Sequence, residues 1–337
     1  MRTQGELALK REGNRIGYAL LIYKGIMNVA VILVTMMAMI PLMIRLMGDT
    51  MAPGSSMPMD PDALSQRLTQ LVQDLTMIVS GWGYLLAVAV GTVLLLVWKK
   101  PRYVGDILKR RGRAMGFGKF WAIMCLFLSA QLLYQMAAGL VERLLQPFGV
   151  SFFDFMEANA VSTETAGMFL YVCLAAPIFE ELVFRGLMLH GLMPYGRRFA
   201  VVMSALFFGL YHGSPLQSMY AILVGLVLGY VAAEYHILWA MVLHMINNLL
   251  VADTLPRLLN LLPLDLGNVV QEAIFVLIFL IALVILLIKH ESIARLWKRE
   301  RVHSWQLRGF FRSPGMILLS VACFAEIGLF IAMLFLA

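Results

Sequence analysis

Long apolar stretches separated by short polar connections organise this chain of 337 residues. A transmembrane helix needs roughly 20 mostly apolar residues, and several shorter stretches fit helices that are tilted or sheltered inside a bundle. We therefore expect an all-α fold, a polytopic bundle of transmembrane helices. The pattern predicts nine spans, over residues 20–47, 76–98, 118–139, 167–192, 199–214, 216–235, 237–252, 268–289 and 315–336.

Composition supports a membrane protein and argues against a soluble one. The chain is 61% hydrophobic and 14% charged, with a mean hydropathy of +0.82. A soluble domain is about 45–50% apolar and about 25% charged. The net charge of +7 does not indicate nucleic-acid binding, because the basic residues lie in connections between apolar stretches. We expect the lipid bilayer as a partner and no nucleic acid.

Basic residues alternate with acidic connections along the chain. Lys and Arg gather in the N-terminal segment and around residues 99–113, 197–198 and 289–312, whereas the connections 49–75, 140–166 and 253–267 are poor in base and contain Asp or Glu. The positive-inside rule then places the N-terminus in the cytoplasm and the C-terminus outside.

Three segments follow from this pattern. We expect residues 1–115 to form an N-terminal transmembrane pair with a basic cytoplasmic loop, and residues 116–289 to form a second bundle whose polar motifs lie within 165–255. Residues 290–337 combine a basic, aromatic segment with the last span. That basic segment is typical of a helix lying on an anionic membrane surface.

Ionisable side chains inside a membrane are costly and are functional candidates by default. One apolar span contains Glu180, Glu181 and Arg185. Glu181 and Arg185 are four residues apart, so they share a helix face and can pair. That pair leaves Glu180 free to point elsewhere. The alternative is that both glutamates only neutralise Arg185 or hold helices together.

Two further spans contain histidines. His212 is followed by Gly213 and Pro215, so the helix is expected to end or kink there. Irregular backbone at membrane depth usually lines a cavity or is buried in protein. His244 and Asn248 are four residues apart and share a face, and both can donate hydrogen bonds to a developing oxyanion. The alternatives are packing for His212 and bonds between helices for the other two.

Three other polar residues lie in or near the predicted spans. On a regular helix Asn247 points about 100° away from Asn248. Lys24 lies near a span end, so it is expected to extend to the membrane interface. Glu326 in the last span has no partner nearby in the sequence, which leaves structural and functional interpretations open.

The ordered motifs resemble those of the CPBP family of intramembrane proteases, also called the Abi family, which includes the CAAX prenyl endopeptidases. They are Glu180-Glu181-x-x-x-Arg185, Phe208-x-x-x-His212 and His244-x-x-x-Asn248, on successive membrane helices over roughly residues 165–255.

The resemblance implies an endopeptidase whose active site lies within the membrane. Glu180 would be the general base that activates water, and His212 would help to hold that water. His244 and Asn248 would stabilise the oxyanion, while Glu181, Arg185 and Phe208 would support the site. The substrate would be a prenylated CAAX-type peptide, a leader peptide or a membrane-associated protein, and we expect a bacterial plasma membrane as the location.

Two questions stay open at this point. No cofactor is certain, but zinc bound by Glu180, His212 and His244 with a water is chemically reasonable. The chain lacks His-Glu-x-x-His, and we favour chemistry without a metal. The competing functions are an ion-coupled transporter that uses Glu180 and the histidines as a proton relay, and a non-enzymatic scaffold or immunity protein of the same fold.

Overall fold

The computed structural model describes residues 2–51, 65–66, 79–94, 102–110, 112–159, 162–299 and 301–336. These residues form helices and loops, and no strand occurs among them, so the predicted all-α class is confirmed. The longer helices are α1 (Arg2–Met51), α4 (Phe117–Leu145), α9 (Arg197–Leu210), α10 (Pro215–Glu234), α11 (Ile237–Asn247), α13 (Leu264–Arg299) and α15 (Pro314–Leu336). The shorter α-helices are α3 (Arg102–Lys109), α5 (Phe152–Ala158), α6 (Ala166–Leu170), α7 (Ala176–Glu181), α8 (His190–Leu192), α12 (Leu255–Leu259) and α14 (Ser304–Phe311).

The nine expected spans each coincide with a helix, but only seven helices among the described residues are long and apolar enough to cross a membrane. The two exceptions are the helix Val79–Leu94 and α9. Residues 76–78 and 95–98 of the expected second span lie outside the described residues. The 14 residues of α9 extend about 21 Å, less than the roughly 30 Å hydrocarbon layer. Alone, α9 is therefore too short to cross this layer.

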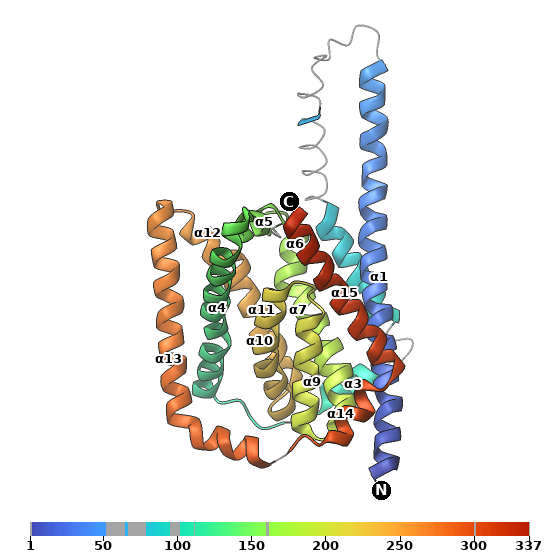
Figure 1. Ribbon diagram of the computed structural model, residues 1–337, viewed down its shortest axis with the longest axis vertical. Helices are drawn as coiled ribbons and strands as arrows, with labels where there is room; N and C mark the ends of the chain where they lie inside the picture. The colour runs from blue at the N-terminus through green and yellow to red at the C-terminus, as the bar shows by residue number, and fades with distance from the viewer. Residues whose placement is uncertain are drawn as a thin grey trace.

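The ends of the bundle differ in charge as the sequence predicts. Figure 1 places the N-terminus, α3 and α14 at one end, and α5, α12 and the C-terminus at the other. The basic N-terminal segment and the basic segment around α14 therefore share one end, and Gln306 of α14 contacts the Tyr195 carbonyl just before Arg197. Most of the acidic connection 49–75 lies outside the described residues. The cytoplasmic assignment of the basic end stays a prediction.

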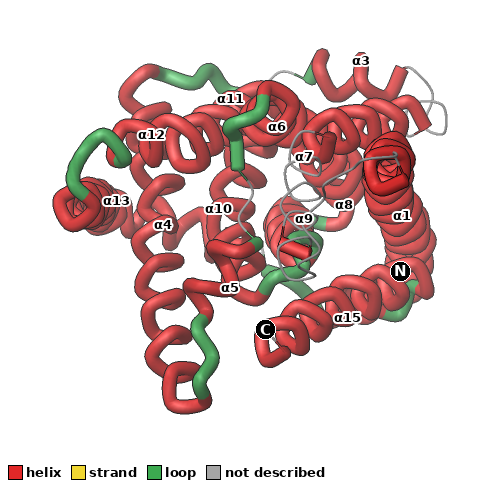
Figure 2. Tube along the Cα trace, turned by 90° about the horizontal axis from the view of Figure 1, so that it is seen from above, coloured by secondary structure: helices red, strands yellow, loops and turns green. Residues whose placement is uncertain are grey.

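The middle of the bundle is formed by α7, α9, α10 and α11, with α4 and α13 on one side and α1 with α15 on the other (Figure 2). The first and last long helices thus lie side by side although they are far apart in the chain. Helix α14 also packs against α1. Helices α1, α14 and α15 therefore form one side of the molecule together.

Lys24 does not extend to the membrane interface, and that expectation is wrong. Its ammonium lies 2.6 Å from Oε2 of Glu326, and only 12% of its side chain is exposed. The partner that Glu326 lacks in the sequence comes from the opposite end of the chain, because α1 and α15 pack together.

Small residues bring α9 and α10 into close contact. Ala221, Gly225 and Gly229 recur every four residues along α10, and small residues of this kind let helices approach closely. A Cβ atom added at Gly225 would lie 3.2 Å from Cα of Ala205 on α9. The approach is tighter at Gly209, where a Cβ atom would lie 2.5 Å from the Ser218 carbonyl oxygen. Only glycine fits there without a shift of backbone.

Substitution of Gly209 by alanine tests this close contact. The added methyl group must displace α10, and overpacking of this kind costs about 1–3 kcal/mol of stability. We expect a lower thermal unfolding midpoint for Gly209→Ala in detergent. Gly139→Ala is the matched control, because no atom lies within 4 Å of its added Cβ atom, and it should leave stability unchanged or raise it by up to about 1 kcal/mol. Equal midpoints for the two variants would contradict the packing.

Candidate active site

The first site helix departs from regular α-helical geometry on both sides of its glutamates. Residues Ala166–Tyr195 form one continuous helical span. Within it, Tyr171–Ala175 and Leu182–Leu189 are π-helical, and the regular α7 lies between them. Each π-helical turn contains one more residue than an α-helical turn, which redirects the side chains that follow. Such segments occur frequently at functional sites. Glu180 and Glu181 are the last two residues of α7.

The predicted ion pair between Glu181 and Arg185 is present and fully buried. Arg185 Nη1 donates to Glu181 Oε1 at 2.8 Å, and both side chains are 0% exposed. Arg185 Nη2 donates to the Gly225 carbonyl at 3.1 Å. The guanidinium carbon lies 4.3 Å from the centre of the Phe208 ring, a distance at which cation–π attraction is substantial. Arg185 is therefore held by three separate elements.

Glu180 takes no part in this ion pair. Its side chain is 28% exposed, and its Oε2 atom lies 3.8 Å from His244 Nε2. Successive helical residues are separated by about 100°. Because Glu181 faces Arg185, the neighbouring Glu180 faces a different surface of the helix. Glu180 also interacts electrostatically with His212 and with the phenols of Tyr23 and Tyr171. It is the partly accessible carboxylate of the cluster.

His212 lies where the sequence predicts a break in the helix. Helix α9 ends at Leu210, and Gly213 has a positive φ of 71°. His212 Nδ1 lies 2.7 Å from the Phe208 carbonyl oxygen. A carbonyl can only accept, so Nδ1 carries the proton in this contact. In the neutral ring the Nε2 lone pair is then free to accept a hydrogen bond from water.

His244 is held by the buried carboxylate. Its Nδ1 atom donates to Glu181 Oε1 at 3.1 Å, and the side chain is 8% exposed. The same oxygen accepts from Arg185, so one buried atom orients both side chains. His244 Nε2 lies 3.8 Å from Glu180 Oε2. An imidazole that already donates through Nδ1 can also donate through Nε2 only when both nitrogens carry a proton.

Asn248 belongs to a chain of hydrogen bonds that the sequence interpretation missed. Tyr220 donates its hydroxyl to Asn247 Oδ1 at 3.0 Å, and Asn247 Nδ2 donates to Asn248 Oδ1 at 3.1 Å. Asn248 Nδ2 donates to the Val172 carbonyl at 2.9 Å. The second N–H of this amide remains available to a ligand. Asn247 therefore does not point away from the site, contrary to the expectation.

The Phe208 ring separates the two histidines and packs on both. Its centre lies 5.0 Å from that of His212 and 5.8 Å from that of His244. It also covers the Arg185 guanidinium. The structure thus gathers Glu180, Glu181, Arg185 and His244 by direct contacts and links His212 to them through Phe208. Polar side chains at Tyr220 and Asn247 in apolar spans were the sequence signal for the missed residues.

The zinc set named from the sequence is not arranged as a ligand set. Among the described residues, no group of three or more His, Cys, Asp or Glu side chains is placed to hold a metal ion. The Nδ1 atoms of His212 and His244 contact the Phe208 carbonyl and the Glu181 carboxylate, so Nε2 is the remaining coordinating atom of each ring. We therefore derive no chemistry through a metal.

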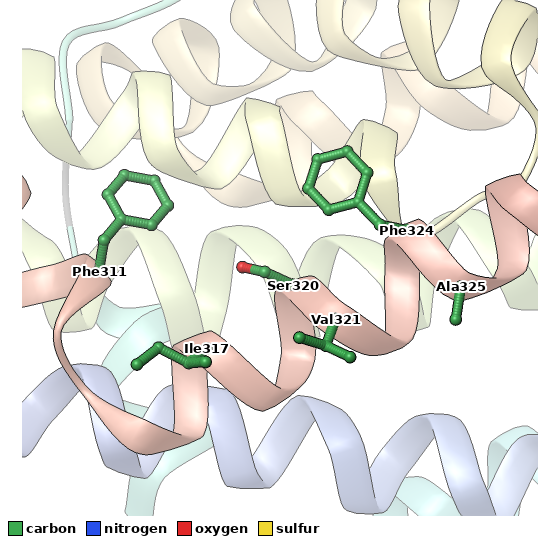
Figure 3. A pocket seen from close by; sticks show the side chains of 6 residues that line it. All are labelled: Phe311, Ile317, Ser320, Val321, Phe324 and Ala325. Atoms are coloured by element: carbon green, nitrogen blue, oxygen red, sulfur yellow. The ribbon is translucent and has the colours of Figure 1, made fainter.

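A groove along α15 is separate from this cluster. It has a volume of about 550 Å³ and contains none of the candidate site residues. Its lining is apolar apart from one hydroxyl group (Figure 3) and consists of Phe311, Ile317, Ser320, Val321, Phe324 and Ala325. Because α15 is a membrane span, lipid chains are sufficient to cover this surface.

Removal of the Arg185 charge tests the buried pair. Arg185→Met leaves Glu181 as an uncompensated buried charge, which costs about 3–5 kcal/mol. We expect a large fall in the thermal midpoint in detergent, and recovery in the double variant Glu181→Leu/Arg185→Met. Arg295→Gln is the control, because that arginine is 72% exposed and such substitutions change stability by less than about 0.5 kcal/mol. Equal effects of Arg185→Met and Arg295→Gln would contradict the buried pair.

Comparison with known proteins gives one match. No curated protein and no solved structure matches the chain significantly. Residues 162–250, which carry all the candidate site residues, match a family model. The family is described as type II CAAX prenyl endopeptidase Rce1-like. This part of the chain is therefore similar to CAAX prenyl endopeptidases, as its motifs predict, and the match supports a CAAX-type protease in an integral, multi-pass membrane protein.

Proposed function

We propose that this protein is an intramembrane endopeptidase in which Glu180 activates a water molecule for attack on a peptide bond. The observation that carries the proposal is the division between the two glutamates. Glu181 is buried and hydrogen-bonded to Arg185 and His244, whereas Glu180 is partly exposed beside His244. A catalytic base needs access to water, and only Glu180 combines that access with contact to the histidine.

The first step is removal of a proton from water. Glu180 takes the proton, and the Nε2 lone pair of His212 accepts a hydrogen bond from the same water. The Nδ1–H bond of His212 to the Phe208 carbonyl supports this role, because it keeps Nε2 unprotonated in the neutral ring. General-base catalysis of this kind contributes about a hundredfold to ten-thousandfold. The proton on Glu180 then passes to the amine that leaves.

The second step is stabilisation of the tetrahedral oxyanion. His244 Nε2–H and the free N–H of Asn248 are the proposed donors. Asn247 supports Asn248 in this role, since its bond to Asn248 Oδ1 fixes which side of the amide carries the donors. Since Nδ1 of His244 donates to Glu181, donation from Nε2 requires the doubly protonated ring, which is part of this proposal. Donors fixed in advance act strongly where bulk water is excluded.

We propose a prenylated CAAX-type peptide as the substrate class, because the family match is to prenyl endopeptidases. Leader peptides and membrane-associated proteins cut near the basic end of the bundle remain the other expected substrates. An active site between membrane helices suits a substrate whose lipid chain lies in the same bilayer. We also propose the bacterial plasma membrane as the location and the core 116–289 as the catalytic part.

Cleavage by the purified full-length protein in detergent tests the proposal. A farnesylated peptide with a CAAX terminus should be cut, and the same peptide without the lipid should be cut more slowly. Glu180→Gln should lower kcat by about a hundredfold or more, because a carboxamide takes no proton. Asn248→Ala should lower it by about a hundredfold to a thousandfold. The readout is the release of the C-terminal fragment, followed by mass spectrometry.

Two controls make the result specific. Glu291→Gln changes a glutamate that is 72% exposed and should retain the wild-type rate. Addition of a chelator should leave the rate unchanged if the reaction uses only the side chains named above. Cleavage that persists in Glu180→Gln would overturn the mechanism, and loss of cleavage with the chelator would assign the chemistry to a metal instead.

A further inference from the structure

Lys24 and Glu326 form an ion pair between the first and last spans of the bundle. The Nζ and Oε2 atoms lie 2.6 Å apart, and the two side chains are 12% and 34% exposed. Lys24 belongs to the apolar span Gln4–Ile40, and Glu326 lies near the middle of α15. Charged residues at such depth are costly, so this pair needs an explanation.

The pair contacts the turn that carries His212. Lys24 Nζ donates to the Tyr211 carbonyl at 2.9 Å and lies 4.1 Å from the centre of the Tyr211 ring. Glu326 reaches the other side of the turn, where its Oε2 atom lies 3.2 Å from the position of a Cβ atom added to Gly213. The residues on both sides of His212 are therefore in contact with the pair. Lys24 also interacts electrostatically with His212 itself.

The local sequence explains why this turn needs an outside donor. In a continuing helix the Tyr211 carbonyl would accept from the backbone N–H four residues later. That residue is Pro215, which has no N–H. The last carbonyls of a helix need partners from elsewhere when they are buried. Lys24 supplies the donor that Pro215 lacks.

Pairing of α1 with α15 does not itself depend on these charges. A Cβ atom added at Gly17 would lie 2.2 Å from the carbonyl carbon of Gly315, so the two backbones are already in contact. Asn14 Oδ1 also accepts from the Gly315 N–H at 2.9 Å. The Lys24–Glu326 pair is therefore not needed to join the two helices. By contrast, Lys24 is the one hydrogen-bond donor to the Tyr211 carbonyl among the described contacts.

We propose that Lys24 and Glu326 are positioning residues of the active site. Lys24 holds the Tyr211 carbonyl and so fixes the turn from which the His212 imidazole projects. Glu326 pairs with the Lys24 ammonium and keeps it directed at that carbonyl. The part of this inference that concerns turnover rests on the proposed function, while the part that concerns the turn does not.

A set of variants separates positioning from simple helix association. Lys24→Met removes the donor and leaves Glu326 unpaired. Lys24→Met/Glu326→Leu removes both charges, and replacement of an ion pair by apolar residues is often neutral for stability. Lys24→Arg keeps the charge and the donor. Lys119→Met is the matched control, because it makes the same change at an exposed lysine of α4.

Three experiments are made on each full-length variant: the kinetics of cleavage of a farnesylated peptide (kcat and KM), thermal unfolding, and hydrogen exchange of the backbone amides in the segment 210–218. We expect Lys24→Met to lower kcat by about tenfold to a hundredfold, as misplacement of a catalytic group does, with little change in KM. Amide exchange in the segment 210–218 should be faster in Lys24→Met than in the wild type. The double variant should recover the thermal midpoint, but its kcat should stay low and its exchange should stay as fast as in Lys24→Met. Lys24→Arg should restore most of kcat, and Lys119→Met should match the wild type.

Recovery of both kcat and slow exchange in the double variant would overturn the proposal and leave a purely structural pair. Unchanged kcat and unchanged exchange in Lys24→Met would overturn it as well. Absence of Glu180-dependent cleavage in the wild type is a different result, because it contradicts the proposed function. In that case the exchange data still decide whether Lys24 holds the turn.

Discussion

The buried ion pair between Glu181 and Arg185 is the constraint on which the rest of the site depends. Both side chains are fully enclosed, so each charge needs the other together with hydrogen bonds around it. Arg185 meets that need with the Gly225 carbonyl and the Phe208 ring, which requires α10 and α9 to approach closely. Glu181 meets it with His244, which fixes α11. Four helical elements are thus ordered by one pair.

The same pair also distinguishes the two glutamates. Glu181 is buried and accepts hydrogen bonds from Arg185 and His244. Glu180 remains the carboxylate with access to water and contact with a histidine. The Nδ1 atoms of the two histidines have different partners. The Phe208 carbonyl beside His212 leaves the Nε2 lone pair of the neutral ring for water, and the Glu181 carboxylate accepts from His244.

Sequence patterns predicted the positions of the helices and the pair of Glu181 with Arg185, because spacing along one helix determines both. They failed where distant segments meet. Lys24 was expected at the interface, yet its partner Glu326 comes from the other end of the chain. Asn247 was expected to face away, but the helix becomes π-helical at Asn248, where the regular step of about 100° no longer applies. The contact of Tyr220 with Asn247 likewise depends on how α10 and α11 pack.

The central claim is that a water molecule activated by Glu180, and not Glu180 itself, attacks the peptide bond. Turnover in water enriched in the heavy oxygen isotope, followed by mass spectrometry of the product and of the enzyme peptide that contains Glu180, tests it directly. The account predicts heavy oxygen in the new carboxyl terminus of the product and none in Glu180. Heavy oxygen in the Glu180 carboxyl group after turnover would contradict it, because that label requires a covalent intermediate on this side chain.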